Sequence, residues 1–277
     1  MKFLIFVSSL FFLGAGCATT APQSQEVLRS PPQVAPAMEI KAVPFIDQDS
    51  GQCGPASLAM AMQWAGHLIP VDQISPQVMT PSKKGSLQED LISACRREGM
   101  MGVRLNGMKA LLEELNAGHP VIIFENLGLS WYQQWHYAVV LGYDLPKEKL
   151  VMHSGHQAFE RVDMRIFERS WKLSDYWGLV VLKPGDLAFA PDELANLAAA
   201  AGLEQIGKSE EARQSYLAIL TRWPVSLGAL VGLANLSYKR GDYQSAVSYL
   251  QMAKKSYPNN QMVAHNLRVA ESAIHTN

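Results

Sequence analysis

The stretch that decides the fold begins at Gln48 and reads Gln48-Asp49-Ser50-Gly51-Gln52-Cys53-Gly54-Pro55, followed by a run of Ala, Met and Leu up to Trp64. The first part is polar and favours a turn, whereas the second consists of good helix formers. Cys53 therefore stands where a loop becomes a helix, and Pro55 suits the first helical turn. Because the positive end of a helix dipole favours thiolate, this position suits a nucleophilic cysteine.

A glutamine upstream of this cysteine is a candidate for stabilising an oxyanion. Gln48 lies five residues before Cys53 and can direct a side-chain N–H toward the same point as the thiol. A buried structural cysteine is the alternative interpretation, which a cysteine alone would favour. The glutamine, the Gly54-Pro55 pair and a suitable histidine downstream favour the nucleophile instead.

Of the seven histidines, His136 is the strongest candidate for the base. It begins the apolar segment 136–143, which follows the aromatic-rich segment 131–135. A histidine at the start of a strand presents its imidazole at the edge of a cleft, while the sheet holds the strand rigidly. The alternative is a structural histidine that contacts the neighbouring aromatic rings. The helix dipole and His136 are both expected to depress the pKa of Cys53 and make it the most reactive thiol.

The composition describes a packed globular protein and excludes several classes. The chain has 277 residues, of which 48% are hydrophobic and 18% charged, enough for one large or two modest domains. Its formal net charge of -1 gives no support for a nucleic-acid partner. No metal-ligand spacing and no phosphate-binding loop are visible, so no cofactor is expected.

The N-terminus has the features of a targeting segment. Lys2 is followed by the apolar run 3–13 and by small residues directly before Cys17. The run is too short to cross a bilayer comfortably. Residues 1–17 resemble a bacterial lipoprotein signal peptide with its lipobox, and an ordinary secretory signal is the alternative. The resemblance implies that Cys17 is lipidated. Because Ala18 rather than Asp follows it, the implied location is the periplasmic face of an outer membrane.

The third cysteine, Cys95, lies in an apolar helical pattern and is expected in the core. If Cys17 carries lipid and Cys53 performs chemistry, a structural disulfide is not expected. A regulatory bridge between Cys53 and Cys95 is a further alternative.

Composition and periodicity divide the rest of the chain. Residues 18–37 are rich in Ala, Pro, Gln and Ser and predict a flexible tether. Residues 38–185 carry helical patterns first and then short apolar runs that predict strands at 121–124, 136–143, 150–153 and 177–182. Helices followed by an antiparallel sheet predict an α+β domain.

Residues 186–277 are helical and repetitive. Positions 207, 212, 216, 219 and 224 correspond, thirty-four residues later, to 241, 246, 250, 253 and 258. These offsets resemble tetratricopeptide repeats, with units at 193–226 and 227–260 and a capping helix at 261–275. The alternative is a pair of generic helical hairpins. We expect few contacts at the boundary with the first domain, so that the repeats can be removed without unfolding it.

The motifs together resemble one enzyme family. The segments are Val43-Pro44-Phe45, Gln48, Gln52-Cys53-Gly54-Pro55-Ala56-Ser57-Leu58 and Trp135-His136-Tyr137-Ala138-Val139-Val140-Leu141-Gly142-Tyr143. They resemble the bacteriocin-processing peptidases that cleave after double-glycine leaders, which are papain-like cysteine peptidases, over roughly residues 40–184. The resemblance is greater to the stand-alone lipoprotein branch that carries repeats. It implies Cys53 as nucleophile, His136 as general base and Gln48 as oxyanion donor, with Gln52 as the rival candidate for that last role.

The chain departs from that family at the third catalytic position. The family usually has Asp or Asn on the strand after the histidine strand, where this chain reads Val151-Met152-His153-Ser154-Gly155. His153 is our candidate acceptor for the His136 ring, and Ser154 is the alternative. Asp144 lies in the preceding turn and is expected to be too distant. The missing carboxylate puts full peptidase activity in question.

Two functions follow from this departure. The first is an envelope-anchored cysteine peptidase that hydrolyses peptide bonds, with repeats that recruit a peptide or protein substrate or a protein partner. The second is a catalytically weak peptidase fold that serves as a peptide-binding or scaffold lipoprotein. The intact Gln48, Cys53 and His136 favour the first, and the absent carboxylate favours the second.

Overall fold

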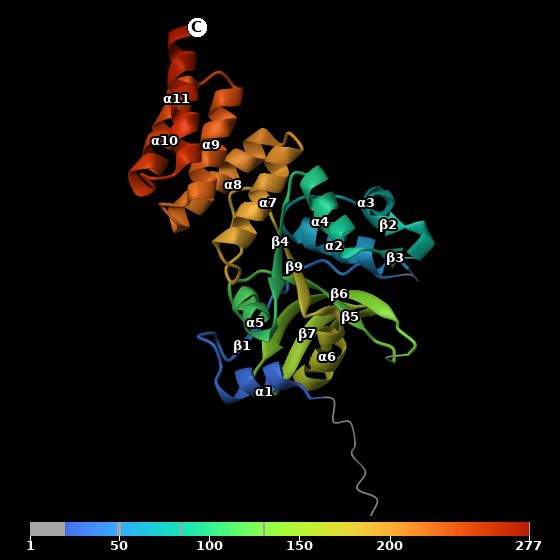
Figure 1. Ribbon diagram of the computed structural model, residues 1–277. Helices are drawn as coiled ribbons and strands as arrows, with labels where there is room; N and C mark the ends of the chain where they lie inside the picture. The colour runs from blue at the N-terminus through green and yellow to red at the C-terminus, as the bar shows by residue number, and fades with distance from the viewer. Residues whose placement is uncertain (1–19, 49–50, 84, 130, 277) are drawn as a thin grey trace, which may run out of the picture.

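The computed structural model describes residues 20–48, 51–83, 85–129 and 131–276. An α+β unit built on an antiparallel sheet is followed by a unit made only of helices (Figure 1), so the predicted fold class is confirmed. The proposed signal peptide and its Cys17 lie outside the described residues. Within those residues, no helix has the length and apolar character needed to cross a membrane.

The first layer is helical and centres on α2, which begins at Cys53 as predicted. Residues 54–62 are all buried, because this helix has apolar side chains around its whole circumference. Figure 1 shows α2 between the sheet and the smaller elements that follow it. These elements are α3 (Val71–Val78), strands β2 (Met79–Thr80) and β3 (Gly85–Ser86) with the 3-10 turn η1 (Pro81–Lys83) between them, and α4 (Gln88–Arg97), while α2 itself spans Cys53–Trp64.

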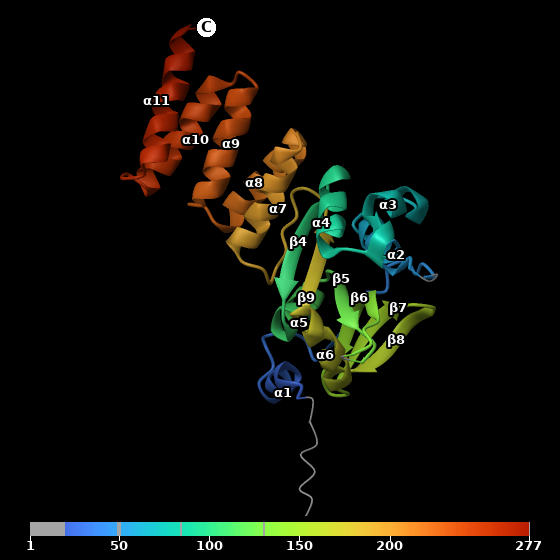
Figure 2. The ribbon, with the colours of Figure 1, turned by 45° about the vertical axis from the view of Figure 1, so that its right-hand side comes forward.

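The second layer is a seven-stranded sheet in which every pairing is antiparallel. Six strands follow the order β4-β9-β5-β6-β7-β8, and β1 pairs with the far end of β6. Helices α5 and α6 pack on the sheet from the side away from α2 (Figure 2). The bounds are β1 Ala37–Glu39, β4 Met101–Asn106, β5 Val121–Asn126, β6 Trp135–Asp144, β7 Lys149–Ser154, β8 Gln157–Asp163, β9 Trp177–Leu182, α5 Met108–Asn116, α6 Met164–Trp171 and the 3-10 turn η2 Lys172–Ser174.

The segment predicted to be a flexible tether is instead partly folded. Helix α1 (Pro22–Arg29) packs against α5 and α6, and β1 joins the sheet. The Ser24 N–H donates to the Glu168 carboxylate at 2.6 Å, and the Ser24 hydroxyl donates to the Met164 carbonyl at 3.0 Å. The tether prediction is wrong because polar residues with few apolar neighbours find partners about 140 positions away, which composition does not reveal.

The C-terminal unit consists of paired helices, as the repeat spacing predicts. Gly207 and Gly241, thirty-four residues apart, have φ of 83° and 78° and end the first helix of each pair in the left-handed region that glycine tolerates. The helices are α7 (Glu193–Gln205), α8 (Ser209–Arg222), α9 (Leu227–Lys239), α10 (Tyr243–Ser256) and the last helix α11 (Gln261–Thr276).

The junction between the two units is more extensive than we expected. Helix α7 packs on β4 and α4, and the buried core runs without a break from the sheet into α7, α8 and α9. The buried Glu114 carboxylate on α5 accepts the backbone N–H groups of Phe189 at 3.0 Å and Ala190 at 2.7 Å. The expectation of few contacts is therefore wrong, because α7 buries one face against the first domain and the other against α8.

A truncation series tests this shared core. A chain ending at residue 185 should melt at least about 10 °C below a chain ending at residue 226, because it exposes several apolar side chains that each contribute about 1.5–3 kcal/mol. Both chains should start at residue 20 and be compared by calorimetry. Equal melting temperatures would show that the repeats add no stability to the first domain.

Candidate active site

The Cys53 thiol lies at the start of α2 in a cavity of about 640 Å³ between the helical layer and the sheet. Gln48, Cys53, His136 and Trp135 line this cavity together. Gly54 is required by the close approach of α2 to β3, since a Cβ at this position would lie 2.5 Å from the Ser86 hydroxyl oxygen. The structure therefore brings together the three residues that the sequence motifs single out.

His136 is the second residue of the central strand β6 and lines the same cavity as the thiol. The backbone N–H of Tyr137, the next residue, donates to the Cys53 sulfur. The His136 Nε2 lies 3.1 Å from the Ser154 hydroxyl oxygen on the neighbouring strand β7. Among the described residues no hydrogen bond engages Nδ1, so the ring has one nitrogen for orientation and one that can take a proton.

The prediction that His153 orients the His136 ring is wrong. Its Nε2 lies 3.3 Å from the Val43 carbonyl oxygen, and its Nδ1 accepts the backbone N–H of Phe159 at 3.2 Å. Successive residues of a strand point to opposite faces, so only one of His153 and Ser154 can reach His136. Ser154, the alternative considered above, is the residue that does so.

Asp144, the carboxylate considered above as a partner for His136, lies too far from that ring, as expected. It ends β6, whereas His136 stands near the beginning of the same strand, and its carboxylate pairs with Lys147 at 2.7 Å.

The side chain of Gln48 is buried and held in place at the cavity. Its Nε2 lies 3.5 Å from the Ser57 hydroxyl, and its Oε1 accepts the backbone N–H of Gly155 at 3.3 Å. A carboxamide has two N–H donors, so one remains for a substrate oxygen in the described part of the site. The rival Gln52 accepts a hydrogen bond from Ser75 on α3 at 3.1 Å and is engaged away from the cavity.

Burial shifts both reacting groups toward their neutral forms. It raises the pKa of the Cys53 thiol, and the backbone N–H groups of Tyr137 and Gly54 lower that pKa by less. Burial also lowers the pKa of His136. The expectation that the pKa of Cys53 is depressed is wrong because desolvation by burial is the largest influence on it. Both shifts favour a neutral thiol and a neutral imidazole over an ion pair.

Alkylation kinetics test this protonation state. The rate of Cys53 labelling by iodoacetamide should rise with pH through an apparent pKa above the ordinary thiol value of about 8.5. Cys95 is fully buried and its pKa is raised to about 12, so it should stay unlabelled in the folded protein and serve as the internal control. Rapid labelling of Cys53 at pH 6–7 would instead reveal a resting thiolate.

A buried carboxyl group that the sequence analysis missed lies beside His136. Glu125 stands directly opposite His136 on strand β5, and its carboxylate accepts a hydrogen bond from the Ser170 hydroxyl. Only 4% of the Glu125 side chain is exposed, and burial raises its pKa to about 7, helped by the nearby Glu160. A charged residue that ends the apolar run 121–124 was the available signal.

Glu125 makes stability depend on pH. Between about pH 4.5 and 7 the folded protein holds a proton on Glu125 that the unfolded chain has lost, so the free energy of unfolding falls as pH rises. Glu125→Gln removes the free-energy cost of ionising this buried carboxyl group. The variant should therefore stabilise the protein by up to roughly 3 kcal/mol more at pH 8 than at pH 5. Urea unfolding at both pH values measures the difference, with Glu271→Gln, at an exposed position of α11, as the control. An effect independent of pH would contradict a buried, titrating Glu125.

The site shows no arrangement suited to a metal. Among the described residues, no group of three His, Cys, Asp or Glu side chains converges as a metal ion requires. The residues that line the cavity can support nucleophilic attack by Cys53, with proton transfer to His136 and hydrogen bonding from Gln48.

Comparison with known families agrees with this geometry. The model of the Peptidase_C39 like family matches residues 40–177, and a Tetratricopeptide repeat model matches residues 229–260. No curated protein matches the chain.

Solved structures of peptidases resemble the first unit. One is a C39-like peptidase from Bacillus anthracis, 20% identical, which covers 53% of this chain and 98% of its own with a TM-score of 0.46. A double glycine motif protease from an AMS/PCAT transporter, in complex with a leader peptide, is 21% identical over 52% and 93% of the two chains, with a TM-score of 0.40. The peptidase domain of Streptococcus ComA is 18% identical over 50% and 98%, with a TM-score of 0.43.

Proposed function

Because the model of the Peptidase_C39 like family matches residues 40–177, we propose that the protein is a cysteine peptidase that hydrolyses peptide bonds. The observation that supports this most strongly is the single cavity shared by Cys53, His136 and Gln48. The thiol and the oxyanion donor come from the segment 48–53 and the base from strand β6, yet all three line one space.

The geometry supports a two-step reaction. Cys53 Sγ attacks the substrate carbonyl carbon as its proton passes to His136 Nδ1, and a Gln48 N–H faces the oxygen on which negative charge develops. His136 then gives that proton to the leaving amine when the C–N bond breaks. Water hydrolyses the resulting thioester and regenerates the thiol. Ser154 orients His136 but brings no negative charge, so it stabilises the imidazolium less than a carboxylate would.

The proposed location is the cell envelope, with Cys17 as the lipidated residue. The N-terminal segment 1–17 supports this proposal through its sequence pattern. Helix α1 begins at Pro22, five residues after Cys17, and that length of chain spans at most about 18 Å. A lipid on Cys17 would therefore hold the peptidase domain close to the membrane surface. A fatty-acid probe should label the wild type but not Cys17→Ser, and equal labelling of both would reject the anchor.

The second candidate function is peptide binding without efficient hydrolysis. Two observations favour it. The group that hydrogen-bonds to the His136 ring is a serine hydroxyl and not a carboxylate, and burial raises the pKa of the Cys53 thiol. In that case the repeats would be the working surface for a protein partner, as the tetratricopeptide match suggests.

Peptide cleavage separates these two functions. The wild type and Cys53→Ala should be incubated with a random library of capped 12-residue peptides, and new N-termini read by mass spectrometry. The peptidase proposal expects new termini only with the wild type. Identical products from both proteins, or none from either, would reject hydrolysis by Cys53.

A further inference from the structure

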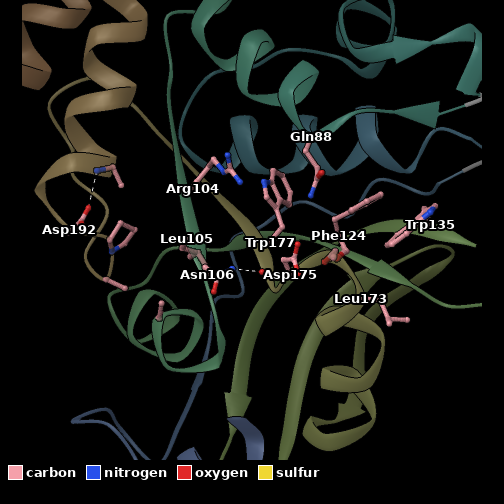
Figure 3. Close-up of a pocket in the computed structure, with 15 residues that line it drawn as sticks. Gln88, Arg104, Leu105, Asn106, Phe124, Trp135, Leu173, Asp175, Trp177 and Asp192 are labelled. Atoms are coloured by element: carbon pink, nitrogen blue, oxygen red, sulfur yellow. Dashed lines mark hydrogen bonds between the residues drawn. The ribbon is translucent and has the colours of Figure 1, made fainter. Parts of the chain in front are cut away.

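A second cavity, of about 750 Å³, lies beside the first on the sheet (Figure 3). Arg104 and Asn106 of β4 and Trp177 of β9 form one wall. Pro191 and, from helix α7, Ala195 also line the cavity, where the chain enters the repeats. This cavity is therefore built jointly by the two units of the protein, and neither unit would form it alone.

The two cavities share a wall of aromatic rings. Phe124 and Trp135 line both, and their rings stack with centroids 4.8 Å apart and an angle of 15° between their planes. Tyr137 lies 4.4 Å from the Phe124 ring and 6.1 Å from the Trp177 ring, measured between centroids. A row of aromatic side chains thus crosses strands β9, β5 and β6 and ends beside Cys53. An extended peptide whose carbonyl lies at Cys53 would continue over Phe124 and Trp135, the two rings that line both cavities.

The Trp177 indole carries a donor that nothing in the described protein satisfies. Only 3% of Trp177 is exposed, and its Nε1 has no hydrogen-bond partner among the described residues. An indole N–H can only donate, so the missing partner must be an acceptor. Figure 3 shows the indole projecting into the region between Arg104 and Gln88. Arg104 is exposed and makes only a surface ion pair with Glu89 at 3.4 Å, which contributes little and can be exchanged.

The charged side chains that line the cavity indicate which kind of ligand it can bind. Besides Arg104, two carboxylates line the cavity, Asp175 and Asp192. The Asp192 carboxylate already accepts the backbone N–H of Ala195 at 3.0 Å. One cation against two anions disfavours a negatively charged ligand. A carboxamide is neutral, and it offers a carbonyl oxygen to the Trp177 and Arg104 donors together with an NH₂ group to an acceptor such as Asp175, which lies beside Trp177 in Figure 3.

We propose that this cavity is a substrate subsite that binds a Gln or Asn side chain of an extended peptide, several residues from the bond that Cys53 attacks. The proposal rests on the proposed peptidase function where it places the subsite relative to the cleaved bond. Binding of the carboxamide in the cavity does not depend on that function. It assigns the start of the repeat unit a direct part in substrate selection, because Ala195 of α7 closes the subsite.

Capped 12-residue peptide libraries test the subsite, with one position at a time fixed as Gln, Glu or Leu. The wild type should cleave Gln-containing peptides roughly tenfold faster than Leu-containing ones when Gln lies at one particular distance from the cut bond. Trp177→Phe, which keeps a ring but removes the donor, and Ala195→Phe, which fills the cavity, should lose this preference. Both should keep the preference for residues next to the cut bond. Trp131→Phe, at an exposed position, is the matched control.

Binding to Cys53→Ala separates failure of the subsite from failure of hydrolysis. The same libraries should be captured on immobilised Cys53→Ala protein and read by mass spectrometry, with Cys53→Ala/Ala195→Phe for comparison. Enrichment of Gln peptides that disappears with Ala195→Phe supports the subsite even if the wild type cleaves nothing. A Gln preference unchanged by both cavity variants, or no Gln preference in either assay, would overturn it.

Discussion

Replacing His136 by alanine is expected to lower kcat/KM by roughly 10³-fold or more, the range seen when one member of a catalytic unit is removed. The effect should be this large because burial keeps Cys53 in its neutral thiol form, so attack depends on a base at the moment of reaction. The measurement is peptide hydrolysis at substrate concentrations above and below KM. The loss should appear mainly in kcat.

A distant histidine provides the matched control. His265 is exposed on α11, and His265→Ala should retain wild-type activity. In the wild type, kcat/KM should stay high to a pH below the ordinary histidine value of about 6.5, because burial lowers the pKa of His136 and only its neutral form accepts a proton. A His136→Ala protein within tenfold of the wild type would remove His136 from the mechanism.

Replacing Gln48 is expected to have the second largest effect, a loss of roughly 10²–10³-fold in kcat, as for other single oxyanion donors. Gln48→Glu is the sharper variant, because it keeps an oxygen that can accept the Gly155 N–H and removes both side-chain donors. It should be as inactive as Gln48→Ala. Gln52→Ala is the control and should change kcat little, since its side chain is engaged with Ser75. If Gln52→Ala were the slower enzyme, the two glutamines would have to exchange roles.

Local sequence patterns predicted the parts of this fold that depend on neighbouring residues. Cys53 was placed correctly at a helix start because the turn and the helix formers adjoin it. The repeat helices followed from a fixed spacing, and the strands of the sheet centre followed from short apolar runs. Strand β8 was missed because it is mostly exposed at the sheet edge and shows no apolar alternation.

The errors share a different cause, which is pairing between distant segments. The choice between His153 and Ser154 depends on which face of β7 each residue occupies, and the register of β7 against β6 contains an irregularity between Val140 and Gly142. Glu125 meets His136 only because β5 and β6 pair. Helix α1 and the repeat junction depend on contacts far along the chain. The resemblance to a peptidase family identified Cys53, His136 and Gln48 without this information.

The central claim is that Cys53 is a nucleophile whose reaction requires His136, and covalent trapping tests it most directly. A peptide aldehyde or Michael acceptor should be added to the wild type, Cys53→Ala and His136→Ala at pH 7, and the intact mass followed with time. The account predicts one adduct on the wild type, mapped to Cys53, no adduct on Cys53→Ala, and labelling of His136→Ala slowed at least about 100-fold. Equal labelling of the wild type and His136→Ala, or an adduct mapped to Cys95, would contradict it.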